Sequence, residues 1–270
     1  MEAETEIMAS QTVTAPQVDE VPSFRVLGVK VSAVQIPDAI ERMEYWIAHE
    51  PSTHYVAVTG MHGVTESQTD ARFKQILNQA DLVVPDGMPL VWLSHRHGFN
   101  LKRRVYGPEL METFCRVTGN QYRHFFYGGA PGVGDDLATQ LNQRHGIQIA
   151  GVYCPPFRPL TEQEQADVIA QVQDAKPDVL WVGLSTPKQE RWMDEFKDRI
   201  RVPVLLGVGA AFDLNSGRLQ QAPPWMRENG LEWLFRLVAE PKRLWRRYLV
   251  QGSKFAWWVG LEMLGLRKFD

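Results

Sequence analysis

Short apolar runs alternate with helix-like segments along most of this chain, and this alternation constrains the fold more than any other feature. Each run has the length of a buried strand and is followed within three residues by a glycine; the runs are 55–58, 82–84, 124–127, 179–182 and 203–208. Strands separated by helical segments are typical of βαβ units with a parallel sheet. The sequence therefore predicts an α/β fold with a mainly parallel sheet flanked by helices.

Changes in this pattern divide the chain into three predicted parts. Residues 1–22 are acidic, rich in Thr, Ala and Pro, and lack an apolar core, so we expect a disordered tail and no signal peptide. Residues 23–222 hold the alternating runs and form the predicted core. Residues 223–270 show helical periodicity without strands, and Pro241 is expected to divide this C-terminal helical appendage.

Charge and composition indicate where a partner would bind. The net charge of −3 does not suggest a nucleic-acid-binding protein, but the segment from Met226 onward carries +4 and leaves −7 for the remainder. Such asymmetry favours an anionic partner for the appendage. Cys115 and Cys154 lie far apart and predict neither a disulfide nor a zinc site. Without a run of about 18 apolar residues, we expect a cytoplasmic protein, peripheral on the inner face of the plasma membrane.

The segment around Asp86 is the first candidate for chemistry. Leu82 to Val84 suits a strand buried on both faces, and Pro85 and Gly87 then interrupt it. Asp86 would stand at the carboxyl end of a parallel strand, where open α/β sheets bind their ligands. A carboxylate there can act as a general base. It can equally shape a turn or cap the following helix, because Asp is frequent in both positions.

A glycine-rich loop at 128–134 follows another predicted strand and opens a helix. Backbone amides of Gly128 and Gly129 could bind a phosphate there. The loop does not match the dinucleotide fingerprint, because Ala130 and Val133 occupy positions that require glycine, and it is no Walker A motif. The alternative is a tight turn that needs glycine for steric reasons alone.

The segment 184–190 stands at a third junction between strand and helix. Thr186 as N-cap, Pro187 at the first helical position and Gln189 at the third would make a capping box. The same helix start, with Lys188 nearby, could instead face an anionic substrate and present Gln189 to a pocket. The sequence leaves both interpretations open.

The arginines and tryptophans of the appendage allow three interpretations. They suit a solvated helix face, a docked helix whose arginines reach a diphosphate, or a helix at the membrane interface. Five of the nine tryptophans lie after residue 224, which favours the last two. No Asp-x-Asp motif is present, and His95 and His97 lack the H-E-x-x-H spacing. We therefore expect no metal site and no cofactor.

Taken together and in order, these segments resemble the WecG/TagA/CpsF family of bacterial glycosyltransferases over residues 24–250. The motifs that carry the resemblance are Pro85-Asp86-Gly87, 105–110, 126–132, 182–190, 209–213, 230–237, 240–243 and 247–249. Each motif alone is weak, but the ordered set is specific. The resemblance implies an inverting, metal-independent enzyme with a Rossmann-like α/β core. Such an enzyme moves a sugar from a UDP-sugar to a sugar on polyprenyl diphosphate, in surface or exopolysaccharide synthesis.

The resemblance also implies roles for individual residues. Asp86 matches the general base, and Thr59 and Gln189 match residues that line its pocket. Residues that match diphosphate-binding arginines lie in the appendage; they are Arg236, Arg243 and Arg246.

This chain departs from the family pattern in two places. Met61, followed by His62, stands where many members have Asn, and Gln221 precedes Ala-Pro where many have Arg. We take His62 as a candidate substrate contact. The donor sugar is therefore left open between glucose and an N-acetylmannosamine type, and a homo-oligomer is compatible with the sequence. A nucleotide-cofactor oxidoreductase and a non-catalytic membrane-associated scaffold are the alternative functions.

Overall fold

The computed structural model describes residues 20–269. Most of the tail predicted at 1–22 lies outside the described residues. The first described elements form an antiparallel hairpin, β1 (Ser23–Val26) and β2 (Val29–Ser32). The hairpin approaches the sheet at β4, where the Ser32 hydroxyl accepts a hydrogen bond from the Val83 N–H at 3.1 Å.

Six strands form one sheet in the order β4-β3-β8-β7-β5-β6, and every neighbouring pair is parallel. The strands are β3 (His54–Thr59), β4 (Leu82–Pro85), β5 (Arg123–Gly128), β6 (Gln148–Tyr153), β7 (Val179–Gly183) and β8 (Val204–Gly207). The predicted α/β fold with a parallel sheet is confirmed. The five apolar runs match β3, β4, β5, β7 and β8 within one residue at every end, because short apolar runs bounded by turn residues mark buried strands sharply. The strand that the sequence predicts at 147–153 matches β6.

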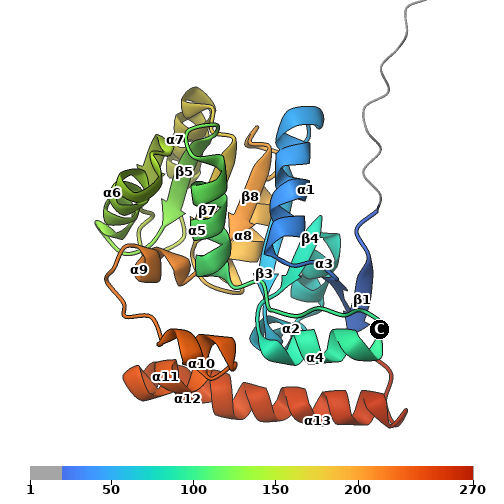
Figure 1. Cartoon of the computed structure of the whole chain (residues 1–270). Helices are drawn as coiled ribbons and strands as arrows, with labels where there is room; N and C mark the ends of the chain where they lie inside the picture. The colour runs from blue at the N-terminus through green and yellow to red at the C-terminus, as the bar shows by residue number, and fades with distance from the viewer. Residues whose placement is uncertain (1–19, 270) are drawn as a thin grey trace, which may run out of the picture.

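Helices cover both faces of the sheet (Figure 1). One face packs against α1 (Ile36–His49), α5 (Gly107–Thr118), α6 (Val133–His145) and α9 (Ala211–Asn215). The other face packs against α3 (Ala71–Gln79), α7 (Glu162–Ala175) and α8 (Lys188–Phe196). Alternate residues of β3 face opposite layers, Val56 and Val58 toward the first and Tyr55 toward the second, as strand geometry requires.

Two helices expected from the sequence differ in detail. The polar segment at about 64–80 predicts a single helix, but it forms α2 (Met61–Glu66) and α3. The Asp70 carboxylate accepts a hydrogen bond from the Phe73 N–H and starts α3 anew. The capping box predicted at Thr186 is also wrong. Helix α8 begins at Lys188, and the Thr186 hydroxyl donates to the Glu190 carboxylate at 2.7 Å instead.

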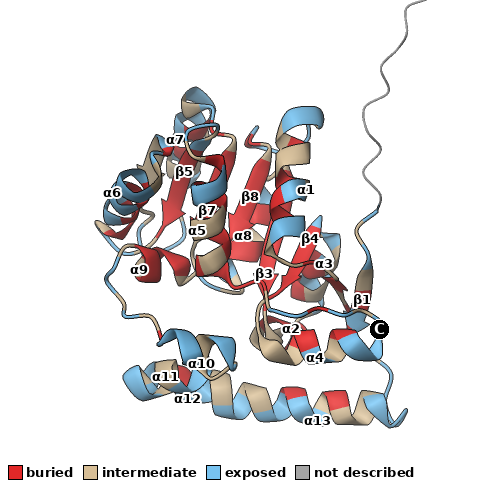
Figure 2. Ribbon diagram, in the orientation of Figure 1, coloured by how far each residue is buried: buried red, intermediate tan, exposed pale blue. Residues whose placement is uncertain are grey.

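The appendage crosses the carboxyl edge of the sheet, below α2 and α4 (Met88–Arg96) in Figure 1. It comprises α10 (Pro224–Glu228), α11 (Glu232–Ala239), α12 (Pro241–Trp245), a π-helical turn η1 (Arg246–Val250) and α13 (Gln251–Met263). The division at Pro241 is confirmed. Phe255 and Val259 of α13 join a core cluster with the hairpin, α2 and α4, whereas much of α10 to α12 is exposed (Figure 2).

Candidate active site

Asp86 lies at the carboxyl edge of the sheet beside the end of β3. Its N–H donates to the Thr59 carbonyl at 2.9 Å, which extends the pairing of β3 with β4 by one residue. A Cβ on Gly60 would lie 2.3 Å from the Asp86 carbonyl oxygen, so only glycine permits this approach. Gly87, not Asp86, is the N-cap of α4, and no side chain caps that helix. The helix-capping interpretation of Asp86 is therefore not supported.

Buried polar atoms without a hydrogen-bond partner gather at the ends of β3, β4 and β7. They are Thr59 Oγ1, His62 Nδ1, Asp86 Oδ1, Gln189 Oε1 and Glu190 Oε2. Buried polar groups are normally paired, because leaving one unpaired costs on the order of 1–3 kcal/mol. A set of five such atoms on adjoining elements indicates a surface built to bind a polar ligand.

Gln189 and Glu190 form one end of this set, at the start of α8. The Glu190 carboxylate accepts from the Thr186 hydroxyl at 2.7 Å and from the Gln189 side-chain amide at 3.2 Å. Gln189 packs beneath β8, since a Cβ on Gly207 would lie 2.9 Å from its Nε2. Glu190 thereby fixes the direction of the Gln189 amide and leaves its oxygen unpaired.

Arg104 connects Asp86 to the appendage. One guanidinium nitrogen lies 3.9 Å from Asp86 Oδ1, and another pairs with the buried Glu232 of α11. The same guanidinium stacks 4.2 Å over the ring of Tyr106. Burial, together with the charge and a hydrogen bond of Glu232, raises the pKa of Tyr106. Near Asp86, the contact between core and appendage is therefore a buried polar network centred on Arg104.

The appendage arginines divide into those that face Asp86 and those that do not. Arg236 and Arg247 are half-buried and act electrostatically on Asp86. Arg246 is exposed and lies 5.4 Å from the ring centre of Trp245. Arg243 is exposed, pairs with Glu240, and acts on the half-buried Asp213. Of the predicted arginines, the structure thus brings Arg236 to Asp86, and it adds Arg247.

Burial sets the protonation of the ionisable groups in this site. Burial raises the pKa of Asp86; the positive charge of Arg104 counteracts this increase, and the negative charge of Glu232 adds to it. Burial also raises the pKa of Glu190. Burial, and then the positive charge of Arg247, lowers the pKa of His62 to about 4. Asp86 is thus a stronger base than a solvated carboxylate, and His62 is neutral at pH 7.

The glycine loop has a steric reason for its glycines. Gly128 has a φ of +127°, and a Cβ there would lie 2.6 Å from the Gly183 carbonyl oxygen. The Gly129 N–H donates to that same carbonyl at 3.1 Å. These contacts support the tight-turn interpretation, since the Gly129 amide is already used within the fold. Phosphate binding by Gly128 and Gly129 stays a prediction.

Sequence reasoning assigned no role to Arg104, Glu190, Glu232 or Arg247. Glu232 is a lone acid within the apolar stretch Leu231 to Leu234, which is a recognisable sign of a buried charge that needs a partner. Arg104 ends the basic run 102–104 next to the family motif at 105–110. Nothing in the sequence distinguishes Arg247 from Arg246.

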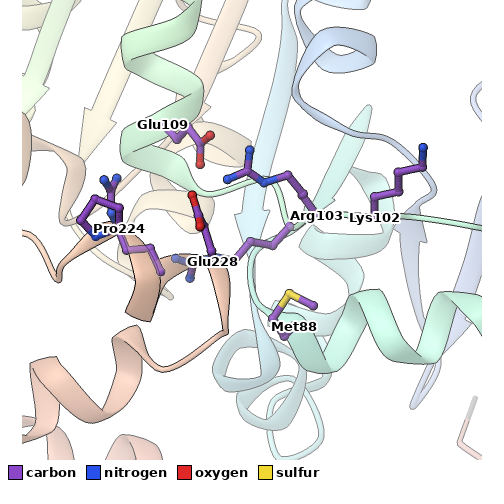
Figure 3. Close-up of a pocket in the computed structure, with 8 residues that line it drawn as sticks. Met88, Lys102, Arg103, Glu109, Pro224 and Glu228 are labelled. Carbon is purple, nitrogen blue, oxygen red and sulfur yellow. The ribbon is translucent and has the colours of Figure 1, made fainter.

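Two cavities flank α5, and neither is lined by Asp86 itself. One of about 130 Å³ lies between the 102–104 segment and α10 and is drawn in Figure 3. The other, of about 270 Å³, lies between α5 and the linker around Gln221. The Asp86 side chain is 27% exposed beneath the appendage. Within residues 20–269, no three His, Cys, Asp or Glu residues are grouped to hold a metal ion.

Comparisons with known proteins agree on one family. The model of the glycosyl transferase WecG/TagA/CpsF family matches residues 24–269. An N-acetylglucosaminyldiphosphoundecaprenol N-acetyl-β-D-mannosaminyltransferase of Staphylococcus aureus is 26% identical over 223 residues, covering 82% of this chain and 86% of that protein. A protein of the same name from Bacillus spizizenii is 31% identical over 186 residues, covering 68% of this chain and 70% of that protein.

The lowered pKa of His62 predicts a loss of stability in acid. The unfolded state, with a histidine pKa of about 6.5, binds more protons than the folded state as pH falls from that value toward about 4. Stability therefore decreases over this window, by up to about 2 kcal/mol at pH 5. Urea unfolding measures the free energy of unfolding at pH 7.5 and at pH 5. This free energy should decrease less between the two pH values for His62→Gln than for the wild type. An equal decrease in both proteins would contradict the lowered pKa of His62. The pKa of the buried His124 is also lowered, but this histidine is present in both proteins and changes their stability by the same amount.

Proposed function

This chain belongs to the WecG/TagA/CpsF family of glycosyl transferases, and from that premise we propose that it transfers a sugar from a UDP-sugar to a polyprenyl-diphosphate-linked saccharide, with Asp86 as the general base. The observation that carries the proposal is a buried oxygen of Asp86 that has no hydrogen-bond partner, among four other buried polar atoms that also have none. The charges of Arg236 and Arg247 act on this carboxylate. Membership of this family gives no support to the oxidoreductase and scaffold alternatives.

In the proposed reaction, Asp86 removes the proton from the acceptor hydroxyl as that oxygen attacks the anomeric carbon of the donor. Its raised pKa suits this task, because a general base works best when its pKa approaches the working pH. The bond to UDP breaks on the opposite face, which gives inversion. Thr59 and Gln189 offer unpaired oxygens to hold the sugars in place.

The departing UDP gains negative charge that the site must stabilise. Arg236 and Arg247 place positive charge on the side of Asp86 that the appendage covers. Low exposure to water there strengthens their attraction to the negative charge of the departing UDP. Both arginines belong to the appendage, so the proposed site is complete only when the appendage is docked. Docking would also keep water from the donor and limit its hydrolysis.

The donor sugar is proposed from the relatives. Both are named as N-acetylmannosaminyltransferases acting on N-acetylglucosaminyldiphosphoundecaprenol. A donor of the UDP-N-acetylmannosamine type is therefore one candidate and UDP-glucose the other, because Met61, His62 and Gln221 differ from the pattern of many members. The two candidate donors can be distinguished with a panel of UDP-sugars. Each is tested with a short-chain lipid diphosphate glycoside as acceptor, and the release of UDP is measured.

Contact with the membrane is proposed through the appendage. Within residues 20–269 no helix combines the length and apolar character needed to cross a bilayer. Most of the large apolar side chains that the described residues expose belong to the appendage and the turn after it; they include Trp225, Val238, Trp245, Leu249, Trp257, Leu264 and Leu266. Tryptophans beside Arg and Lys suit the headgroup boundary, where a lipid-linked acceptor is found.

The first prediction tests the base. Asp86→Asn keeps the size of the side chain but cannot accept the proton, so transfer should fall by about 10²–10⁴-fold. UDP binding by calorimetry and the thermal unfolding temperature should stay close to wild type. Transfer at the wild-type rate, or a loss of stability that matches the loss of activity, would contradict the proposed role.

The second prediction uses two neighbouring arginines as a matched pair. Arg247→Gln should lower kcat at least tenfold, because a charge-assisted contact to the leaving group contributes about 1.5–3 kcal/mol. Arg246→Gln, which removes an exposed guanidinium, should change kcat by less than about twofold. The opposite ranking in a UDP-release assay would assign the diphosphate to Arg246, as the family resemblance implies.

The third prediction concerns membrane binding. The double variant Trp257→Ala, Leu264→Ala removes two exposed apolar side chains from the appendage and should reduce cosedimentation with vesicles containing anionic lipids. Val117→Ala, Ile149→Ala removes two exposed apolar side chains from the core and serves as the control. Equal binding by both double variants would exclude this face as the membrane contact.

A further inference from the structure

The cavity of about 130 Å³ beside the site is formed jointly by core and appendage (Figure 3). Arg103 and Arg104 line it from the segment before α5, and Glu109 lines it from α5 itself. Arg227 and Glu228 line it from α10. Because its walls come from both parts of the chain, this cavity exists only when α10 is docked.

The charged side chains around this cavity have hydrogen-bonding capacity left over. Across residues 20–269, the side chains of Arg103, Glu109 and Glu228 make no hydrogen bond or ion pair with protein groups. Arg227 donates to the Gln221 side chain at 3.1 Å, and its Nε is buried without a partner. In Figure 3 the Arg103 guanidinium points toward the side of the cavity where Glu109 and Glu228 lie. The Lys102 amine points in the other direction.

The cavity adjoins the proposed base. Arg104 lines it and lies 3.9 Å from Asp86 Oδ1. Met88, two residues beyond Asp86, forms an apolar wall of the cavity. It packs closely against Gly230, where a Cβ would lie 2.8 Å from Met88 Cγ. A ligand seated here would therefore contact Arg104, which itself lies beside Asp86.

The charge pattern selects the kind of ligand. The carboxylates of Glu109 and Glu228 stand against the cations Lys102, Arg103 and Arg227. The fourth cation, Arg104, is already opposed by Asp86 and Glu232, so four positive and four negative groups balance around the cavity. Such a balanced set does not favour a diphosphate, which Glu109 and Glu228 would repel. It does suit a neutral, hydroxyl-rich group, since carboxylates accept and guanidinium groups donate directional hydrogen bonds.

We propose that this cavity binds the saccharide of the lipid-linked acceptor next to Asp86, with Arg103, Glu109 and Glu228 as the residues that select that saccharide. The inference rests on the proposed function and deepens it. The appendage then contributes to both substrates: α11 and η1 supply charge for the departing UDP, and α10 closes the acceptor side.

The test measures separate kinetic constants for acceptor and donor. The probe is N-acetylglucosaminyl diphosphate carrying a short prenyl chain, assayed without vesicles, with the UDP-sugar that the panel identifies. Glu109→Gln, Glu228→Gln and Arg103→Gln should each raise the acceptor KM about tenfold, the equivalent of one charge-assisted hydrogen bond, with little change in the donor KM. Arg116→Gln, an exposed arginine elsewhere on α5, should leave both constants unchanged.

A direct binding measurement avoids turnover. In the Asp86→Asn background, the acceptor probe should bind about tenfold more weakly when Glu228→Gln is added. If the cavity instead held the diphosphate, both Glu→Gln variants would bind the probe more tightly and only Arg103→Gln more weakly, which would overturn the saccharide assignment. Unchanged acceptor constants in all three variants of an active enzyme would overturn the inference and leave the proposed function standing. A wild-type protein inactive with every UDP-sugar would overturn both.

Discussion

The guanidinium of Arg104 is the interaction on which the arrangement of core and appendage depends. It approaches Asp86 on one side, pairs with Glu232 on the other and stacks on Tyr106. A buried ion pair contributes little net stability, because desolvation offsets the attraction, but breaking it by removing one partner is costly. Arg104 therefore determines the position in which α11 docks on the core more than it determines the stability of that docking. The charge balance at Asp86 consequently includes a residue, Glu232, that is present only when the appendage is in place.

The fold was largely readable from the sequence. The runs at 82–84 and 179–182 became β4 and β7 with one residue added to each, because burial on both faces requires uninterrupted apolar residues. Polar helices were harder. The segment 64–80 lacks a Gly or Pro break at Ser67 to Asp70, and the structure divides it by a local cap at Asp70. Competing side-chain contacts also displaced the cap expected at Thr186, since Glu190 is buried and takes its hydroxyl.

The candidate site was readable only in part. Asp86, Thr59 and Gln189 follow strands, and parallel strands bring their carboxyl ends to one edge, so their proximity follows from topology. The appendage offers no such rule. Its arginines lie on short helices, and neighbouring residues of a helix point in directions about 100° apart. Arg247 therefore faces the site while Arg246 faces solvent, and Arg104 meets Glu232 across 128 residues of sequence.

The Glu262 carboxylate of α13 accepts a hydrogen bond from the Leu27 N–H, 235 positions earlier in the chain. Phe255 and Val259 pack into the same cluster as Val26 and Leu27. Contacts of such long sequence separation form late, because the intervening chain must first be ordered. The first and last described elements of the chain therefore hold each other in place, and the appendage is anchored to the core at two separate points, α11 and α13.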